Sequence, residues 1–187
     1  MQNDLIKSYL SDVQELLAEV SENEIRTIVD ILKEAYESDR QVFLLGNGGS
    51  AATASHLACD LQKGIGGFYA KRFRVLAVTD SIPIITAWAN DTDYSNVFAR
   101  QVANFVNSKD VVIGISGSGN SPNVVEAMKL ANKKDAMTVG LAGYAGGKLA
   151  QTAKCCITIR SENMQQIEDV HLVLAHLIFT CLMKELV

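Results

Sequence analysis

The sequence predicts an α/β fold: a doubly wound, five-stranded parallel sheet flanked by helices. Five short, almost wholly apolar runs lie between residues 41 and 159, segments with helical apolar spacing separate them, and glycine- and serine-rich loops follow two of the runs. Uniformly apolar strands are typical of parallel sheets, which are covered on both faces. In such folds, ligands bind beyond the carboxyl ends of the strands.

The predicted strands share a content of branched aliphatic and small residues. They cover residues 42–45, 75–78, 111–115, 137–141 and 156–159. The helices expected between and after them cover residues 50–62, 82–106 in two pieces, 122–133, 147–153 and 164–186. Alternation of strand and helix in this order is the pattern of a doubly wound sheet.

Two further helices, over residues 5–20 and 22–38, come before the first strand. Ser21 and Glu24 have the spacing of a capping box at the start of the second one. With 187 residues, 48% of them hydrophobic, the chain can bury a full core. We therefore expect a single domain over residues 1–187, with residues 1 to about 40 as a helical extension.

The charge pattern argues against direct nucleic-acid binding. The formal charge of −4 comes from 17 basic and 21 acidic residues, with no run of Lys or Arg to follow a phosphodiester backbone.

The longest apolar stretch, residues 172–183, is too short to span a bilayer and contains His176. With a polar amino terminus, this predicts a cytoplasmic protein without a membrane partner. The four cysteines lack zinc-ribbon spacing, so we expect them to have packing roles.

The loop from Ser116 to Ser121 is the strongest functional signal in the chain. It joins the third strand to a helix, with Ser121 suited to the N-cap and Pro122 to the first helical position. Three hydroxyls and the free N–H groups of a helix start make an anion site. The loop has no P-loop lysine, and no acidic ribose partner follows it, so a sugar monophosphate fits better than a nucleotide. A plain strand-to-helix turn is the alternative.

A second loop, Gly46-Asn47-Gly48-Gly49-Ser50, occupies the same position after the first strand. Parallel strands end at one edge of the sheet, so the two loops should lie together. One loop can hold a phosphate while the other presents backbone amides and the Asn47 side chain to a sugar hydroxyl or carbonyl. Turn formation alone is again the alternative reading.

Histidines and carboxylates share faces of two predicted helices. His56 and Asp60 are spaced i and i+4, and the last helix carries Glu168, His171 and His176. Imidazole and carboxylate ligands suit zinc or a similar divalent ion, and either group can carry protons. The simpler readings are a surface pair for His56 and Asp60 and a buried core or interface histidine for His171.

Taken together, these motifs resemble the sugar isomerase (SIS) domain family and, within it, the phosphoheptose isomerases, which convert sedoheptulose 7-phosphate to D-glycero-D-manno-heptose 7-phosphate. The resemblance covers nearly the whole chain. It rests on G-N-G-G-S at 46–50, His56, Asn90-Asp91, I-S-G-S-G-N-S at 115–121 and E-D-V-H-L-V-L-A-H at 168–176.

The resemblance implies roles for these residues. The phosphate would be held by Ser116, Gly117, Ser118 and Ser121, and the sugar contacted by Asn47, Gly48, Ser50, Asp91 and Glu168. One Zn²⁺ per subunit would be bound by His56, Asp60, Glu168 and His176. The family forms homotetramers with sites at subunit interfaces, which would give the two amino-terminal helices a partner surface.

Four positions depart from the common family pattern. Asp60 replaces the usual catalytic Glu, Glu168 stands where many members have Gln, Gly64 where an Arg often follows, and Gln165 where an Asp can occur.

Aldose–ketose interconversion needs a base that moves a proton between neighbouring carbons and a group that stabilises the enediol oxygen. We assign the catalytic proton transfers to Asp60 and His176, with zinc as the Lewis acid.

Two other functions remain open at this point. One is a non-catalytic SIS protein, like the replication-initiation regulators that contact the initiator protein DnaA and share both loops. The other is a metal-independent isomerase of another ketose phosphate. The histidine and carboxylate set favours catalysis over the regulator, because a scaffold has no need of it.

Overall fold

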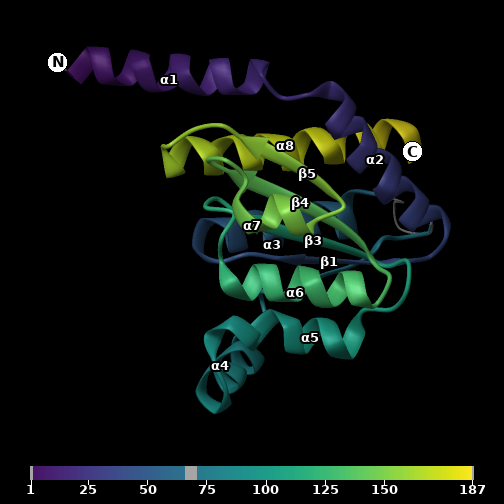
Figure 1. Ribbon diagram of the computed structural model, residues 1–187. Helices are drawn as coiled ribbons and strands as arrows, with labels where there is room; N and C mark the ends of the chain where they lie inside the picture. Colours follow the sequence, from purple (N-terminus) through teal and green to yellow (C-terminus); the bar gives the residue numbers. More distant parts are fainter. Residues whose placement is uncertain (1, 66–70, 187) are drawn as a thin grey trace.

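The structure, a computed structural model, describes residues 2–65 and 71–186 (Figure 1). Within these ranges a five-stranded parallel sheet has the strand order β2-β1-β3-β4-β5. The strands are β1 (Gln41–Leu45), β2 (Arg74–Ala77), β3 (Val111–Ser116), β4 (Met137–Gly143) and β5 (Cys155–Ile159). This order confirms the predicted doubly wound sheet and makes β1 and β3 neighbours.

Eight α-helices and one short 3-10 helix surround the sheet within the described ranges. They are α1 (Gln2–Ala18), α2 (Glu22–Glu37), α3 (Gly48–Gly64), α4 (Ile82–Asp91), η1 (Tyr94–Asn96), α5 (Val97–Phe105), α6 (Pro122–Lys133), α7 (Gly147–Thr152) and α8 (Met164–Leu186). The two pieces predicted over residues 82–106 are α4 and α5, with η1 between them. Ser21 accepts a hydrogen bond from the Glu24 N–H, as its N-cap position predicts.

The helices form one layer on each face of the sheet. Successive β1 side chains point to opposite faces. Val42 and Leu44 therefore pack with α2, α3 and α8, whereas Phe43 and Leu45 pack with α5, α6 and α7. Because both faces are covered, all four of these residues are fully buried, which explains why the strands read as continuous apolar runs.

Two helices leave apolar side chains uncovered. Helix α1 projects beyond the body of the molecule (Figure 1), and its Leu5, Ile6 and Leu10 are 60–70% exposed. Helix α4 lies at the opposite end and has no buried residue, although it is rich in isoleucine. These surfaces have the composition of protein interfaces rather than of a solvated helix.

Helix α8 is long and apolar enough to cross a membrane when judged by length and composition alone. It packs instead on the sheet, between α3 and α2, and its Val170, Leu174, Ile178 and Leu182 belong to the core. Its apolar composition is therefore that of a core helix.

His171 lies in the same buried stripe of α8. The side chain is 1% exposed, and its Nε2 is 3.0 Å from the carbonyl oxygen of Ala142 at the end of β4. Its Nδ1 has no hydrogen-bond partner among the described residues. Burial lowers the pKa of His171 to about 4, and the hydrogen bond to Ala142 opposes this shift. The ring is therefore neutral near pH 7 and links α8 to β4.

Protonation of His171 should make the fold less stable in mild acid. Between pH 6.5, the ordinary pKa of His, and about pH 4, His171 is protonated in the unfolded chain but not in the folded chain. The free energy of unfolding should therefore decrease as the pH is lowered across this window, by on the order of 3 kcal/mol from this group. Urea unfolding of wild type and His171→Gln at several pH values measures it. The variant should lose that much less stability, and parallel curves would contradict the assignment.

Candidate functional site

The two predicted loops meet at the carboxyl ends of β1 and β3. Residues 46–50 lead into α3 on one face of the sheet, and residues 117–121 lead into α6 on the other. Gly46 lies close to the end of β3: a Cβ built there would be 3.0 Å from the oxygen of Ile115 and 2.8 Å from the Ser50 carbonyl group of its own loop. The first loop therefore packs against the strand that leads into the second loop.

The three serines of the second loop face one small volume. The Oγ of Ser116 is 3.0 Å from that of Ser121 and 3.5 Å from that of Ser118. Ser121 is the N-cap of α6 and Pro122 its first residue, as predicted. Within the described chain, however, the Ser121 side chain makes no capping hydrogen bond and turns to Ser116 instead. The hydroxyl cluster therefore lies at a helix start whose N-cap side chain is not used for capping.

Asn120 holds this loop in shape. Its N–H donates to Ser118 Oγ over 3.1 Å, and its Nδ2 donates to the Ser118 carbonyl over 3.0 Å. Its Oδ1 accepts the Lys148 N–H near the start of α7. The preceding position, Gly119, has φ +65°, and a Cβ there would overlap the Gly146 carbonyl. A glycine is needed at this position for both reasons.

An amide pair that the sequence did not reveal joins the two loops. Asn47 and Asn123 exchange hydrogen bonds of 2.9 and 2.8 Å, and the Tyr94 hydroxyl donates to Asn47. Asn123 follows Pro122 in the first turn of α6, where polar side chains often bond the free N–H groups. That position was the available signal for Asn123; for Tyr94 the sequence offered none.

Asn47 occupies the N-cap of α3, but among the described residues its side chain forms no capping bond. The N–H groups of Gly48, Gly49 and Ser50 therefore face the site without a side-chain acceptor from the N-cap. Helices α3 and α6 thus both begin at neighbouring strand ends, and neither N-cap side chain forms a capping bond within the described chain. Their partial positive charge favours an anion there.

Glu168 lies beside this first loop. A Cβ built at Gly49 would overlap the Glu168 carboxylate, so the carboxylate rests directly on the backbone of α3. Asp91 ends α4 and accepts a hydrogen bond from Asn90. Three residues later, Tyr94 reaches Asn47, which brings this segment to the same edge of the sheet.

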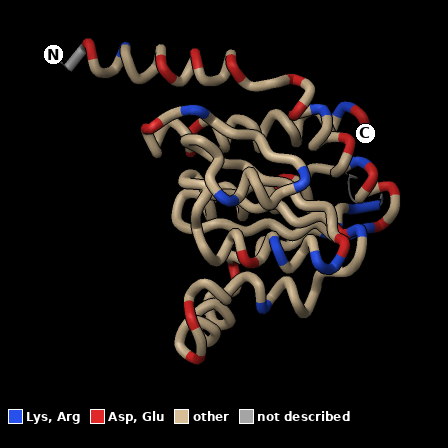
Figure 2. Tube along the Cα trace, in the orientation of Figure 1, with Lys and Arg blue, Asp and Glu red and all other residues tan. Residues whose placement is uncertain are grey.

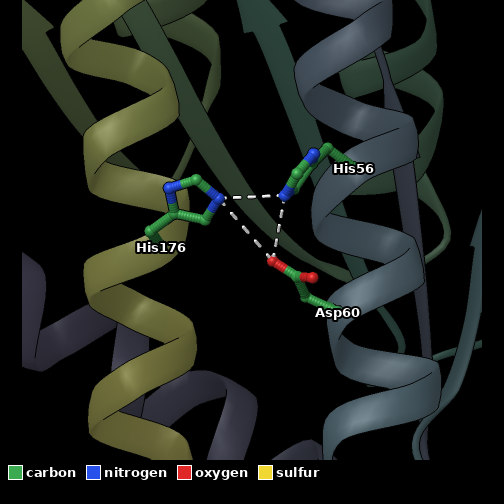
Figure 3. A group of neighbouring side chains, drawn as sticks. All are labelled: His56, Asp60 and His176. Carbon is green, nitrogen blue, oxygen red and sulfur yellow. Dashed lines mark hydrogen bonds and ion pairs between the residues drawn. The ribbon is translucent and has the colours of Figure 1, made fainter.

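A second cluster consists of His56, Asp60 and His176 (Figure 3). His56 and Asp60 come from α3, and His176 comes from α8, which packs beside it. The two Nε2 atoms are 2.9 Å apart, and the Asp60 Oδ2 is 3.4 Å from His56 and 4.0 Å from His176. One side-chain atom of each residue thus points to a common position. The imidazoles are about half exposed, so solvent or a partner can reach the cluster.

Glu168 is not part of this cluster within one chain. It precedes His176 by eight positions on α8, about 12 Å at the helical rise. On α3, His56 follows Ser50 by six positions, about 9 Å. The residues predicted to act together therefore form two groups: Glu168 with the loops, and the three-residue cluster further along the helices.

The close contact between Gly49 and Glu168 predicts the effect of a methyl group. Alanine in place of glycine normally stabilises a helix by about 1 kcal/mol. Gly49→Ala should gain less than this in wild type, because the new Cβ must displace the end of the flexible Glu168 side chain. In a Glu168→Ala background the same substitution should bring the full gain, since the space is then free. Urea unfolding of the two single variants and the double variant measures this. An equal effect in both backgrounds would show that the two groups do not touch.

Known proteins resemble the chain over most of its length. Residues 8–143 match the SIS domain family. A phosphoheptose isomerase of Sulfurimonas denitrificans is 37% identical over 164 residues, covering 88% of this chain and 84% of that protein. One from Aneurinibacillus thermoaerophilus is 35% identical, covering 94% and 91%.

Solved structures agree with the sequence relatives. The phosphoheptose isomerase of Neisseria gonorrhoeae is 26% identical with a TM-score of 0.89, covering 97% of this chain and 98% of that one. The NanR protein of Vibrio vulnificus, solved with ManNAc-6P, is 16% identical with a TM-score of 0.72, covering 99% of this chain and 63% of that one, and shares the fold alone. The chain therefore belongs to the SIS domain family and, within it, to the phosphoheptose isomerases.

Proposed function

We propose that this chain is an aldose–ketose isomerase that converts sedoheptulose 7-phosphate to D-glycero-D-manno-heptose 7-phosphate. The observation that carries the proposal is a hydroxyl-lined anion site at two helix starts, on a chain that also gathers His56, Asp60 and His176. The relatives named phosphoheptose isomerase support the substrate.

The phosphate is held by hydroxyls and backbone amides. Ser116, Ser118 and Ser121 supply the hydroxyls, and the Gly117 backbone belongs to the same turn. Neither loop contains Lys or Arg. Favourable charge therefore comes from the starts of α3 and α6. Figure 2 shows Lys and Arg interspersed with Asp and Glu over the rest of the described chain.

The sugar is contacted by groups around the first loop. The backbone of Gly48 and the side chains of Asn47 and Ser50 offer hydrogen bonds to its oxygens, with Asp91 and Glu168 as acceptors for hydroxyls. Binding of the remote phosphate and hydroxyls fixes the reacting carbons in place, which lowers the entropic part of the barrier.

The reaction moves a proton from C1 of the ketose to C2, and a second proton from the C1 hydroxyl to the C2 oxygen. Asp60 and His176 are the groups assigned to these transfers, because a carboxylate or an imidazole positioned at the substrate can act as a general acid or base. His56, 2.9 Å from His176, orients that ring. Asp60 has one methylene fewer than the usual Glu, so it must stand closer to the substrate.

The cluster also fits a zinc ion. Two imidazole nitrogens and a carboxylate oxygen, all within 4.8 Å of one another, are a donor set typical of catalytic zinc, with room for an exogenous ligand. Bound there, the metal would act as a Lewis acid on the carbonyl and hydroxyl oxygens. Glu168, the fourth ligand expected, lies about 12 Å along α8 from His176 and is not among the three clustered residues.

Assembly into a homotetramer is consistent with the uncovered apolar surfaces. Leu5, Ile6 and Leu10 of α1 are 60–70% exposed in the described chain. On α4, Ile82 and Ile84 are exposed, while Ile85 and Trp88 pack against the core. Leu172 and Leu177 of α8, near His176 in the sequence, are also exposed. A neighbouring subunit on these surfaces would bring its own loops toward the cluster. A cytoplasmic location stays a prediction.

Removing the carboxylate of Asp60 should separate binding from chemistry. Asp60→Asn should lower kcat for sedoheptulose 7-phosphate by at least about 100-fold, the usual contribution of a general base, while phosphosugar binding stays within a few-fold. Stopped assays and calorimetry give the two quantities. Asp135→Asn is the control, because Asp135 accepts a hydrogen bond from Ser108 just before the amino ends of β3 and β4, away from both loops. Unchanged turnover in Asp60→Asn would refute the role.

Zinc binding should depend on the cluster. Wild type should bind about one Zn²⁺ per chain, and His56→Ala and His176→Ala should each weaken binding at least 10-fold, because each removes a ligand. Elemental analysis and titration of the metal-free protein measure this. Cys59→Ser tests the exposed thiol beside Asp60 and should change nothing. Full affinity in the doubly substituted His56→Ala/His176→Ala protein would place the metal elsewhere.

A further inference from the structure

The amide pair of Asn47 and Asn123 has an orientation that the backbone dictates. The Val124 N–H, in the first turn of α6, donates to Asn123 Oδ1 over 2.9 Å. A backbone N–H can only donate, so the oxygen of Asn123 must face it and the nitrogen must face the other way. Asn123 is 2% exposed, and its side chain is confined to this arrangement.

The orientation of Asn123 then sets that of Asn47. Asn123 Oδ1 accepts from Asn47 Nδ2 over 2.9 Å, and Asn123 Nδ2 donates to Asn47 Oδ1 over 2.8 Å. Turning the Asn47 amide over would place nitrogen against nitrogen and oxygen against oxygen. The backbone of α6 therefore fixes the orientation of Asn123, and Asn123 fixes that of Asn47 in the first loop.

Asn47 is left with a single hydrogen-bonding function. Its Oδ1 also accepts from the Tyr94 hydroxyl over 3.0 Å, so both acceptor positions of that oxygen are filled. Among the described residues, one Nδ2–H of Asn47 has no partner. Asn47 can therefore donate one hydrogen bond to a ligand but cannot accept one.

The same pairing keeps Asn47 away from the start of α3. An N-cap asparagine ordinarily accepts from the second or third N–H of its helix, here Gly49 or Ser50. The Asn47 oxygen is engaged by Asn123 and Tyr94, and no capping bond forms within the described chain. The N–H groups of the helix start stay available to an anion or a sugar oxygen.

We propose that Asn123 is a positioning residue for the phosphosugar site: it holds the Asn47 amide as a donor and prevents that side chain from capping α3. Asn123 itself is buried and acts through Asn47, joining the α6 loop to the α3 loop. Without it, Asn47 rotates onto the helix start and occupies the position of a substrate oxygen. The part of the inference that concerns turnover rests on the proposed function.

A double-mutant cycle tests whether Asn123 acts through Asn47. Asn123→Ala should lower kcat/KM for sedoheptulose 7-phosphate about 10-fold or more, and Asn47→Ala by a similar factor. Added to Asn47→Ala, the Asn123 substitution should change kcat/KM less than about two-fold, because the residue that it positions is gone. Multiplying effects in the double variant would overturn the proposal.

Asn132→Ala is the matched control. Asn132 lies on the same helix, α6, and makes two comparable hydrogen bonds, to the Thr152 carbonyl and from the Thr138 hydroxyl, away from both loops. It should lower stability by a similar amount and leave kcat/KM unchanged. If it lowers kcat/KM as much as Asn123→Ala does, the effect is structural and the positioning role is wrong.

Tyr94→Phe decides the question if Asn123→Ala does not fold. Tyr94 is 53% exposed, so its hydroxyl can be removed without opening the core. It should lower kcat/KM in the wild-type background, by less than Asn123→Ala, and have no effect in the Asn47→Ala background. An effect of equal size in both backgrounds would overturn the proposal.

Measuring binding as well as turnover of sedoheptulose 7-phosphate distinguishes failure of the positioning role from failure of the proposed function. If wild type binds sedoheptulose 7-phosphate without turning it over, the isomerase proposal fails, and the same cycle of variants read as dissociation constants by calorimetry decides the role of Asn123. If wild type turns the sugar over and the effects of Asn47 and Asn123 multiply, the positioning role fails alone. A wild type that neither binds nor converts the sugar overturns both.

Discussion

The pairing of β1 with β3 is the constraint on which the rest of the site depends. These strands are neighbours, yet the helices that follow them pack on opposite faces of the sheet, α3 on one and α6 on the other. The two chain segments must therefore diverge at the sheet edge, which leaves an open position between two helix starts. Glycines at 46 and 119 are needed because the backbone turns there without room for a side chain.

The proposed function places anion binding and proton transfer on different parts of the molecule. The hydroxyls and amides proposed to bind the phosphate lie at the sheet edge, where the N-cap side chains of Asn47 and Ser121 make no capping bonds within the described chain. The residues proposed for proton transfer belong to the cluster of His56, Asp60 and His176, further along α3 and α8. In this arrangement the phosphate would be held by two helix starts, apart from the reacting carbons.

The strands and both loops could be predicted because their signals are local: apolar runs, and glycine and serine at strand ends. Shared faces within one helix, as for His56 and Asp60, followed from spacing alone. That His176 meets them, and that Glu168 does not, depends on how α8 packs beside α3, which no local pattern encodes. The Asn123 pair was missed for the same reason, because its partner lies 76 positions away.

Association through the projecting helix α1, as proposed above, would make the state of the protein depend on its own concentration. Much of its apolar face meets water in the isolated chain, and a helix of this length gains little stability from propensity alone. Covering that face by another copy would couple the order of the helix to association by mass action. On dilution the outer turns of α1 would then fray as copies separate, so local order and catalytic competence would share one concentration dependence.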